Sequence, residues 1–243
     1  MADERAKPAR LHQHCQDVVT DVAGGPEAVR SPSTRPSSIH QGSLNDDGLV
    51  VLARHGRTEL NAAGLLRGHL DPALDSVGET EVLALGRAVA QTLAGRPVVR
   101  IVCSPLRRAI QTASAIAAAL PEPPVVQAAQ GLIDRDYGHW AGHSREEVQA
   151  RFGSVDAADG VESAIAVTER ARAALDAQLP LLASGALVLV AHDAVNRLLL
   201  ASLDPGLGPA DEIGQSTACW NLLSYRDHTW QVDRVDQKVW VPD

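Results

Sequence analysis

Arginine and histidine side chains follow three short apolar segments of this chain. Arg54 and His55 come directly after LVVLA, Arg108 comes shortly after VVRIVC, and His192 comes directly after ALVLVA. Guanidinium groups bind phosphate oxygens through paired hydrogen bonds, and a neutral imidazole can attack phosphorus to form a covalent phosphohistidine. These residue types therefore indicate phosphoryl transfer, if the fold brings the three segments together.

The three apolar segments, residues 49–53, 98–103 and 186–191, are predicted to be buried strands. Apolar residues at helical spacing lie between them, and this alternation is typical of parallel sheets. Residues 217–226 and 229–236 alternate in polarity, which predicts a hairpin. We therefore expect an α/β fold, a three-layer α/β/α sandwich with a mainly parallel sheet and an antiparallel edge hairpin. The expected helices are residues 76–95, 104–120 with Ser104 as N-cap, 144–152, 161–184 with a kink at Pro180, and 194–203.

The carboxyl ends of parallel strands lie at one edge of a sheet, where open α/β folds bind their ligands. Arg54, His55, Arg108 and His192 are therefore expected to converge there and to bind a phosphate dianion. The positive charge of Arg54 favours the neutral form of His55. Gly56 allows the backbone to approach an anion without an intervening Cβ.

A leaving alkoxide needs a proton, and a carboxyl group can supply it and later activate water. Asp134 and Asp136 lie in LIDRDYGHWAG, in a loop before a turn of glycine and aromatic residues. From the residues alone, each aspartate fits a catalytic acid and a turn residue that pairs with Arg135 equally well. Both alternatives stay open at this point.

Four segments of the chain resemble the sequence blocks of the histidine phosphatase superfamily, and more specifically its phosphoglycerate-mutase-like branch. A fifth segment, GLLRGHLDPALDSVG (64–78), is also similar to a segment of that branch. The ordered combination is specific, whereas RHG alone is a weak signal. The four blocks are RHGRTELN (54–61), SPLRRAIQTA (104–113), LIDRDYGHWAG (132–142) and VAHDAVNR (190–197), within a resemblance that covers residues 48 to 236.

The resemblance implies that His55 is the nucleophile that becomes phosphorylated. It also implies that Arg54, Arg108 and His192 form the phosphate pocket. Arg108 is preferred to its neighbour Arg107 because it directly precedes an alanine, as in the family pattern.

Further roles in the site follow from the same resemblance. Thr58 and Asn61 match positions that help to line the phosphate pocket. Asp134 lies where the family usually has a glutamate that acts as proton donor, and aspartate is one methylene shorter. Asp193 follows His192 as in the acid-phosphatase branch, whose aspartate is the donor, but Asp193 is also suited to cap a helix. Asp134 is therefore the favoured acid and Asp193 the alternative.

The function expected from the resemblance is hydrolysis of small phosphomonoesters by a metal-independent phosphatase, without a cofactor, through a phosphohistidine on His55. The first alternative is a phosphoglycerate-type mutase. Such mutases generally carry a longer insertion between the second and third blocks, and here only residues 110–133 separate Ala109 from Asp134. The second alternative is a weakly active phosphate-binding regulatory module, for which the shortened acid at Asp134 is the reason.

The composition excludes other classes of partner. The formal net charge is −8 and aromatic residues make up 3% of the chain, so we expect no binding to nucleic acid or to an acidic membrane. The apolar runs are too short to span a bilayer. Three cysteines without a CxxC motif fit a reducing compartment, which predicts a cytoplasmic location.

The chain is expected to divide into two parts. Residues 1–47 are rich in Pro, Ser, Gln, His and Gly and are predicted to form a disordered tail, and residues 48–243 are predicted to form the phosphatase domain. Arg67 and His69 fit either the rim of the pocket or solvated loop positions. His139 and His143 are four residues apart, but the glycine between them argues against one helical face and a metal site.

Overall fold

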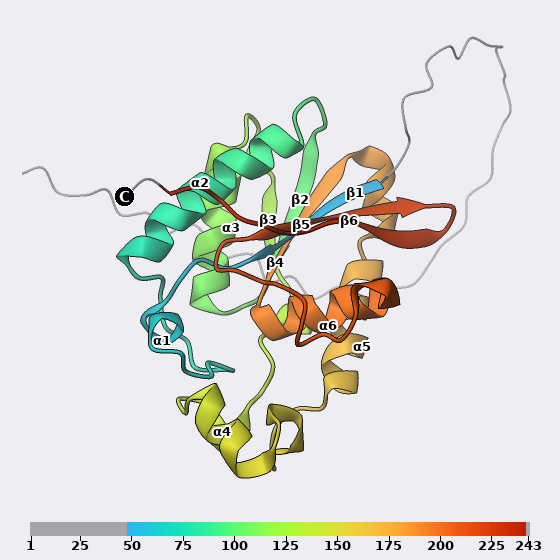
Figure 1. Ribbon diagram of the computed structural model, residues 1–243. Coiled ribbons are helices and arrows are strands. Elements are labelled where there is room, and N and C mark those ends of the chain that lie inside the picture. Colours follow the sequence, from blue (N-terminus) through green and yellow to red (C-terminus); the bar gives the residue numbers. More distant parts are fainter. Residues whose placement is uncertain (1–47, 242–243) are drawn as a thin grey trace, which may run out of the picture. The chain divides into compact units, whose positions relative to one another are not determined.

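The computed structural model describes residues 48–241, so the predictions for residues 1–47 lie outside the described part of the chain. Strands and helices alternate along this part, as Figure 1 shows. Its elements are β1 (Gly48–Arg54), α1 (Glu59–Ala62), α2 (Ser76–Thr92), β2 (Val98–Cys103), α3 (Arg107–Ala119), β3 (Val125–Ala128), α4 (Arg145–Phe152), α5 (Ala164–Asp176), β4 (Ala186–Ala191), α6 (Asp193–Leu203), β5 (Trp220–Arg226) and β6 (Thr229–Gln237).

The strands form one sheet in the order β3-β2-β4-β1-β5-β6. The pairs β2–β3, β2–β4 and β1–β4 are parallel, whereas β5 runs antiparallel to both β1 and β6. The hairpin between β5 and β6 turns at Asp227 and His228, whose φ angles of 48° and 60° are left-handed, as a tight hairpin turn requires. The predicted α/β fold with a mainly parallel sheet and an antiparallel edge hairpin is thus confirmed.

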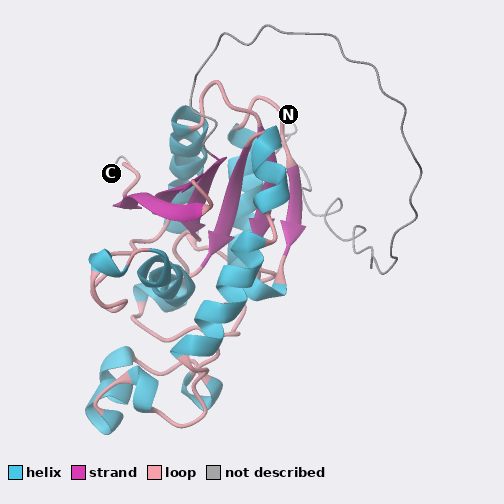
Figure 2. Cartoon of the chain, turned by 90° about the vertical axis from the view of Figure 1, so that its right-hand side faces the viewer, coloured by secondary structure: helices cyan, strands magenta, loops and turns pink. Residues whose placement is uncertain are grey.

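The sheet lies between two layers of helices, as Figure 2 shows. Successive side chains of a strand point to opposite faces, and β1 follows this rule. Val51 and Ala53 belong to the core beneath α2 and α3, whereas Val50 and Leu52 belong to the core beneath α5 and α6. Because all four side chains are fully buried, the end of β1 is held rigidly from both faces.

The central strands end level with one another. Arg54 at the end of β1 pairs in register with Ala191 at the end of β4, and Cys103 at the end of β2 pairs with Val190. The residues that follow these strands therefore start from one edge of the sheet. Below this edge in Figure 1, residues 138–162 with α4 form a cap that has its own small apolar cluster around Trp140 and Val148.

The first turn of α3 differs from the prediction. The helix begins at Arg107 with Leu106 as N-cap, and no side chain caps it. Ser104 lies before the helix, where its Oγ accepts a hydrogen bond from the backbone N–H of Leu106 at 3.3 Å. The hydroxyl therefore fixes the turn that leads from β2 to the helix, and the prediction of Ser104 as N-cap was wrong.

Three other features were not predicted correctly. Pro180 does not kink a single helix, because α5 ends at Asp176 and Pro180 lies in a separate 3-10 segment, Leu179–Ser184. Strand β3 is a short, mostly exposed edge strand and α1 is a single turn, and such short elements carry little periodicity.

Within residues 48–241, no helix is long and apolar enough to cross a membrane.

Candidate active site

His55 is the first residue after β1, and backbone hydrogen bonds from both neighbouring strands fix its position. Its N–H donates to the carbonyl of Ala191 at 3.1 Å, and the N–H of Arg54 donates to the carbonyl of Cys219 at 3.0 Å. Because β4 runs parallel to β1, the residue after Ala191 stands beside His55. The two imidazole rings, of His55 and His192, have centroids 5.0 Å apart and meet at 60°.

The hydrogen bonds of the His55 ring define its tautomer. Nδ1 lies 2.7 Å from the carbonyl oxygen of Gly56, and a carbonyl only accepts, so Nδ1 carries the proton. Nε2 accepts a hydrogen bond from Nε of Arg108 at 3.2 Å. The lone pair of Nε2 therefore points into the site, which is the arrangement that a nucleophilic imidazole needs.

Both site histidines are held in the neutral form. Burial lowers the pKa of His55 well below its ordinary value, and Arg108, Arg54 and Arg67 lower it further. The pKa of His192 is lowered well below its ordinary value by burial and then by Arg108. The effect that we expected from Arg54 on His55 is present, but burial and Arg108 act more strongly.

Arg108 lies at the centre of the site and is fully buried. Its Nη1 donates to the carbonyl of Leu70 at 2.7 Å and its Nη2 to the carbonyl of Gly68 at 3.0 Å. Nη2 also pairs with Oδ2 of Asp134 at 2.9 Å. Arg107, in contrast, is exposed. The loop after α1 and the loop after β3 are thus both attached to one guanidinium.

Asp134 lies beside Arg108 and His192. Besides its bond to Arg108, its Oδ2 lies 3.7 Å from Nδ1 of His192. Its Oδ1 accepts a hydrogen bond from the backbone N–H of Arg135 at 2.9 Å. With only 1% of its surface exposed, the carboxylate is fixed in direction, so the shorter side chain still reaches the cluster around His55.

Asp193 lies on the other side of the cluster and is surrounded by arginines. Its Oδ1 accepts from Nε of Arg197 at 2.5 Å and lies 3.8 Å from Nη1 of Arg54. Its Oδ2 lies 4.0 Å from Nη2 of Arg145, which belongs to α4 of the cap. Burial alone raises the pKa of Asp193, but Arg54 and Arg197 outweigh it and lower the pKa overall. Asp193 is therefore ionised at neutral pH.

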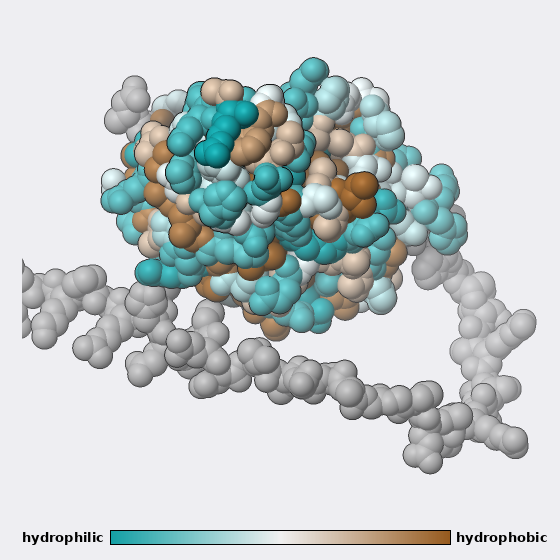
Figure 3. Space-filling view, turned by 90° about the horizontal axis from the view of Figure 1, so that it is seen from below, coloured by the Kyte–Doolittle hydropathy of each residue, from teal (hydrophilic) through white to brown (hydrophobic). Residues whose placement is uncertain are grey.

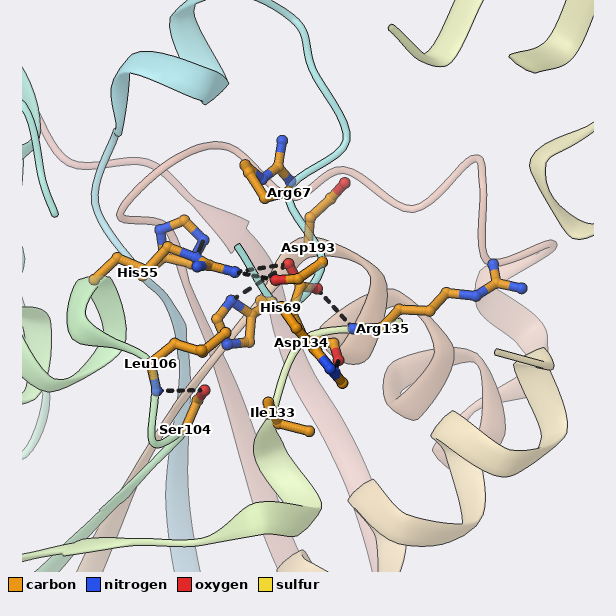
Figure 4. Close-up of polar contacts among 12 residues, drawn as sticks. His55, Arg67, His69, Ser104, Leu106, Ile133, Asp134, Arg135 and Asp193 are labelled. Carbon is orange, nitrogen blue, oxygen red and sulfur yellow. Dashed lines mark hydrogen bonds and ion pairs between the residues drawn. The ribbon is translucent and has the colours of Figure 1, made fainter. Parts of the chain in front are cut away.

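Several buried nitrogen atoms of the site have no hydrogen-bond partner within residues 48–241. These atoms are Nε of Arg54, Nε of Arg67 and both ring nitrogens of His192. Buried polar groups in native structures are normally paired. The two arginine Nε atoms can only donate, and the neutral ring of His192 offers one donor and one acceptor, so the cluster indicates a site for an acceptor-rich ligand. Figure 4 shows Arg67 above His55 and Asp193, and the ring of His192 lies beside that of His55, so unpaired nitrogen atoms lie close to the nucleophile.

Thr58, Asn61 and Gly56 have local structural roles. Thr58 is the N-cap of α1, and its Oγ1 donates to Oδ1 of Asn61 at 2.8 Å within a capping box. At Gly56, an added Cβ would lie 2.6 Å from Cγ1 of Val82 on α2. The glycine is therefore required by close packing against α2, which is a different reason from the approach of an anion that we expected.

Arg67 and His69 at the rim bond to backbone carbonyls, whereas His143 pairs with a carboxylate. His69 donates through Nε2 to the carbonyl of Asp134 at 3.0 Å, and Arg67 donates through Nη1 to the carbonyl of Leu65 at 3.1 Å. His143 pairs with Glu147 at 3.1 Å on the surface of the cap. Within residues 48–241, no group of three or more histidine, cysteine or acidic side chains is arranged to hold a metal ion.

Two contacts of the site were not foreseen from the sequence. Arg54 donates through Nη1 to the backbone carbonyl of Gln215, far along the chain. A backbone carbonyl has no sequence signal. Arg145 approaches Asp193 from the cap, and its position depends on how α4 folds back over the sheet.

Most of the chain is similar to one known protein family. Residues 50–238 match the model of a family described as the histidine phosphatase superfamily (branch 1). A 2,3-bisphosphoglycerate-dependent phosphoglycerate mutase from Methylobacterium sp. (strain 4-46) is 38% identical over 108 residues, which are 43% of this chain and 50% of the mutase. The chain thus spans about half the length of that relative.

Longer matches come from mycobacterial proteins. A glucosyl-3-phosphoglycerate phosphatase from Mycobacterium tuberculosis (strain ATCC 25618 / H37Rv) is 28% identical over 200 residues, 72% of this chain and 84% of the relative. The solved structure of mycobacterial glucosyl-3-phosphoglycerate phosphatase in complex with VO3 matches with a TM-score of 0.67 and 28% identity, and covers 78% of this chain and 99% of that one.

Proposed function

This chain belongs to branch 1 of the histidine phosphatase superfamily, and on that basis we propose that it hydrolyses small phosphomonoesters through a phosphohistidine on His55. The observation that carries the proposal is the ring of His55. Its Nδ1 is fixed by the carbonyl of Gly56, and its Nε2 lone pair points toward Arg108. The relatives include both a mutase and a phosphatase. The connection from α3 to Asp134 is short, and because mutases of this type generally carry a longer insertion there, it favours a phosphatase.

The proposed reaction has two steps. First, Nε2 of His55 attacks phosphorus, the ester P–O bond breaks, and the leaving oxygen takes a proton from Asp134. Then water attacks the phosphohistidine, Asp134 accepts a proton from that water, and the N–P bond breaks to release phosphate. Arg54, Arg108 and His192 stabilise the charge on the phosphoryl oxygens in both steps. Neither step needs a metal ion.

The choice of Asp134 as the acid rests on the surroundings of the two candidates. Asp134 points at Arg108 and His192, which would bind the phosphoryl group. Asp193 is held by Arg54 and by Arg197 of α6. We propose that Asp193 positions Arg54 instead. A cytoplasmic location, expected from the cysteine pattern, is also part of the proposal.

The test measures free phosphate and isomerised product from a panel of phosphomonoesters without added metal, for the wild type and for His55→Ala. We expect phosphate release and an acid-labile phosphoenzyme, both of which are lost in His55→Ala. Isomerisation that requires a bisphosphate primer would replace the phosphatase by the mutase. If the wild type shows no turnover and forms no phosphoenzyme, the chain would instead be a phosphate-binding module.

A further inference from the structure

A second cavity lies next to the phosphate cluster, between α4 of the cap and α6. We call it the α4–α6 pocket; it has a volume of about 110 Å³. Its walls come from α4 and the turn that follows it, from the first turns of α6, from residues 210–211 after α6, and from the loop after Asp134. On the face of the molecule that lies toward the cap, hydrophilic and hydrophobic residues are interspersed (Figure 3).

The α4–α6 pocket and the phosphate cluster share Asp193. This residue lines the pocket, and its Oδ1 also lies 3.8 Å from Nη1 of Arg54. Tyr137, which lines the pocket as well, is buried and follows Asp134 closely along the same loop. The pocket and the phosphate cluster are therefore adjacent at Asp193 and at the loop that carries Asp134.

The charges that line the α4–α6 pocket cancel. Its three guanidinium groups face three carboxylates, and most of them are paired directly. Arg135 pairs with Asp156 at 2.5 Å, and Arg197 pairs with Asp193 at 2.5 Å. The charged residues of the lining are Arg135, Arg145, Arg197, Asp156, Asp193 and Asp211.

A paired lining of this kind selects an uncharged, hydrogen-bonding ligand. A second anion would meet the buried carboxylate of Asp193 at the junction and would have to displace existing ion pairs. Hydroxyl groups can donate to the carboxylates and accept from the guanidinium groups without breaking a pair. The phenol of Tyr137 remains protonated because burial raises its pKa, so it adds a neutral hydroxyl to the lining.

We propose that the α4–α6 pocket binds an uncharged, hydroxyl-rich alcohol part of the substrate, so that the preferred substrates are sugar or polyol phosphates. This inference rests on the proposed phosphatase function. Asp193 accepts a hydrogen bond from a hydroxyl near the ester, and Arg145 of the cap donates to a hydroxyl deeper in the pocket. Arg145 is suited to this because its only carboxylate neighbour within residues 48–241 lies 4.0 Å away.

The experiment compares kcat/KM for glucose 6-phosphate, cyclohexylmethyl phosphate and 3-phosphoglycerate. The first two are primary esters with six-membered rings and differ mainly in their hydroxyl groups. We expect glucose 6-phosphate to be preferred over both others. Arg145→Met should lower the ratio of kcat/KM for glucose 6-phosphate to kcat/KM for cyclohexylmethyl phosphate by about tenfold, the typical effect of one hydrogen bond to a charged group. Ala210 also lines the pocket, so the larger side chain in Ala210→Leu should narrow the pocket and reduce the ratio of kcat/KM for glucose 6-phosphate to that for cyclohexylmethyl phosphate.

The control is Arg151→Met, because Arg151 lies on the same helix but packs over Trp140 outside the pocket. It should leave the ratio unchanged. A preference for 3-phosphoglycerate that Arg145→Met removes would overturn the inference, because the pocket would then bind an anion. Equal rates with all three esters in every variant would also overturn it. If none of the esters is hydrolysed, the proposed phosphatase function fails instead.

Discussion

Nε of Arg108 donates to Nε2 of His55 across 3.2 Å, so the arginine is bonded to the atom that is proposed to attack phosphorus. The same lone pair cannot accept this hydrogen bond and form the N–P bond. Binding of substrate must therefore exchange one contact for the other, with phosphoryl oxygens replacing Nε2 as the acceptors for Arg108. The nucleophile is held in its attacking direction until that exchange takes place.

Arg108→Lys should lower kcat/KM by roughly 10² to 10³, because lysine offers a point charge in place of a planar fork. It also cannot reproduce the contacts to Leu70, Gly68 and Asp134 together. The measurement is steady-state hydrolysis of phenyl phosphate. Arg107→Lys serves as the matched control, since its side chain is exposed, and an equal loss in both variants would argue against a specific role for Arg108.

Arg67→Met should raise KM and lower kcat/KM by about tenfold. Within residues 48–241, Arg67 has no carboxylate at ion-pair distance, and its Nε is buried without a partner. Its charge already lowers the pKa of both His55 and His192, which places it within electrostatic reach of the phosphoryl group. The loss is measured with phenyl phosphate.

Arg87→Met, on the exposed surface of α2, is the control for the loss of one positive charge from the protein. If Arg87→Met lowers kcat/KM as much as Arg67→Met, the effect comes from net charge rather than from the site. Partial recovery in Arg67→Lys would support a direct contact with the substrate, since lysine keeps the charge.

The convergence of the site could be predicted because it depends only on strand direction. His55 and His192 follow neighbouring parallel strands, so the register of Arg54 with Ala191 brings them together. The buried strands themselves were recognisable as apolar runs. This prediction did not depend on the conformation of any loop.

The contacts that come from loops could not be predicted in the same way. The pair of Arg108 and Asp134 depends on the path of the chain after β3, a short edge strand with no clear pattern. Asp193 was suited to cap a helix, yet the N-cap of α6 is His192 and the carboxylate turns to Arg54 and Arg197 instead. Residue types and their spacing predict neither of these contacts.

Asp134→Asn should slow the hydrolysis of alkyl phosphates by roughly 10² to 10⁴, the usual contribution of a general acid. The loss should be much smaller for 4-nitrophenyl phosphate, whose leaving group needs no proton. Asparagine is chosen over alanine because Arg108 is fully buried and would otherwise lose its partner. Rates for both classes of ester give the comparison.

Asp193→Asn is the matched variant for this test. We expect it to change the rates for alkyl and nitrophenyl esters by a similar factor, because Asp193 acts through Arg54. A loss confined to alkyl esters in Asp193→Asn, with Asp134→Asn unaffected, would assign the proton donor to Asp193.

The free energy of unfolding should fall as the pH is lowered below about 6.5, the ordinary pKa of histidine. His55 and His192 have lowered pKa values in the folded protein, so the unfolded chain binds protons there first. The stabilisation that comes from the two neutral histidines is fully present above their pKa in the unfolded chain. It is lost as the pH falls toward their lower pKa in the folded protein. Each histidine contributes a slope of about 1.4 kcal/mol per pH unit.

Urea unfolding at a series of pH values measures this slope. His192→Asn should remove about half of the part that comes from the two site histidines. The control is His228→Asn, because His228 is exposed in the hairpin turn and asparagine accepts its left-handed φ of 60°. An unchanged slope in His192→Asn would mean that His192 is protonated in the folded protein, and the neutral pair at the centre of the site would have to be abandoned.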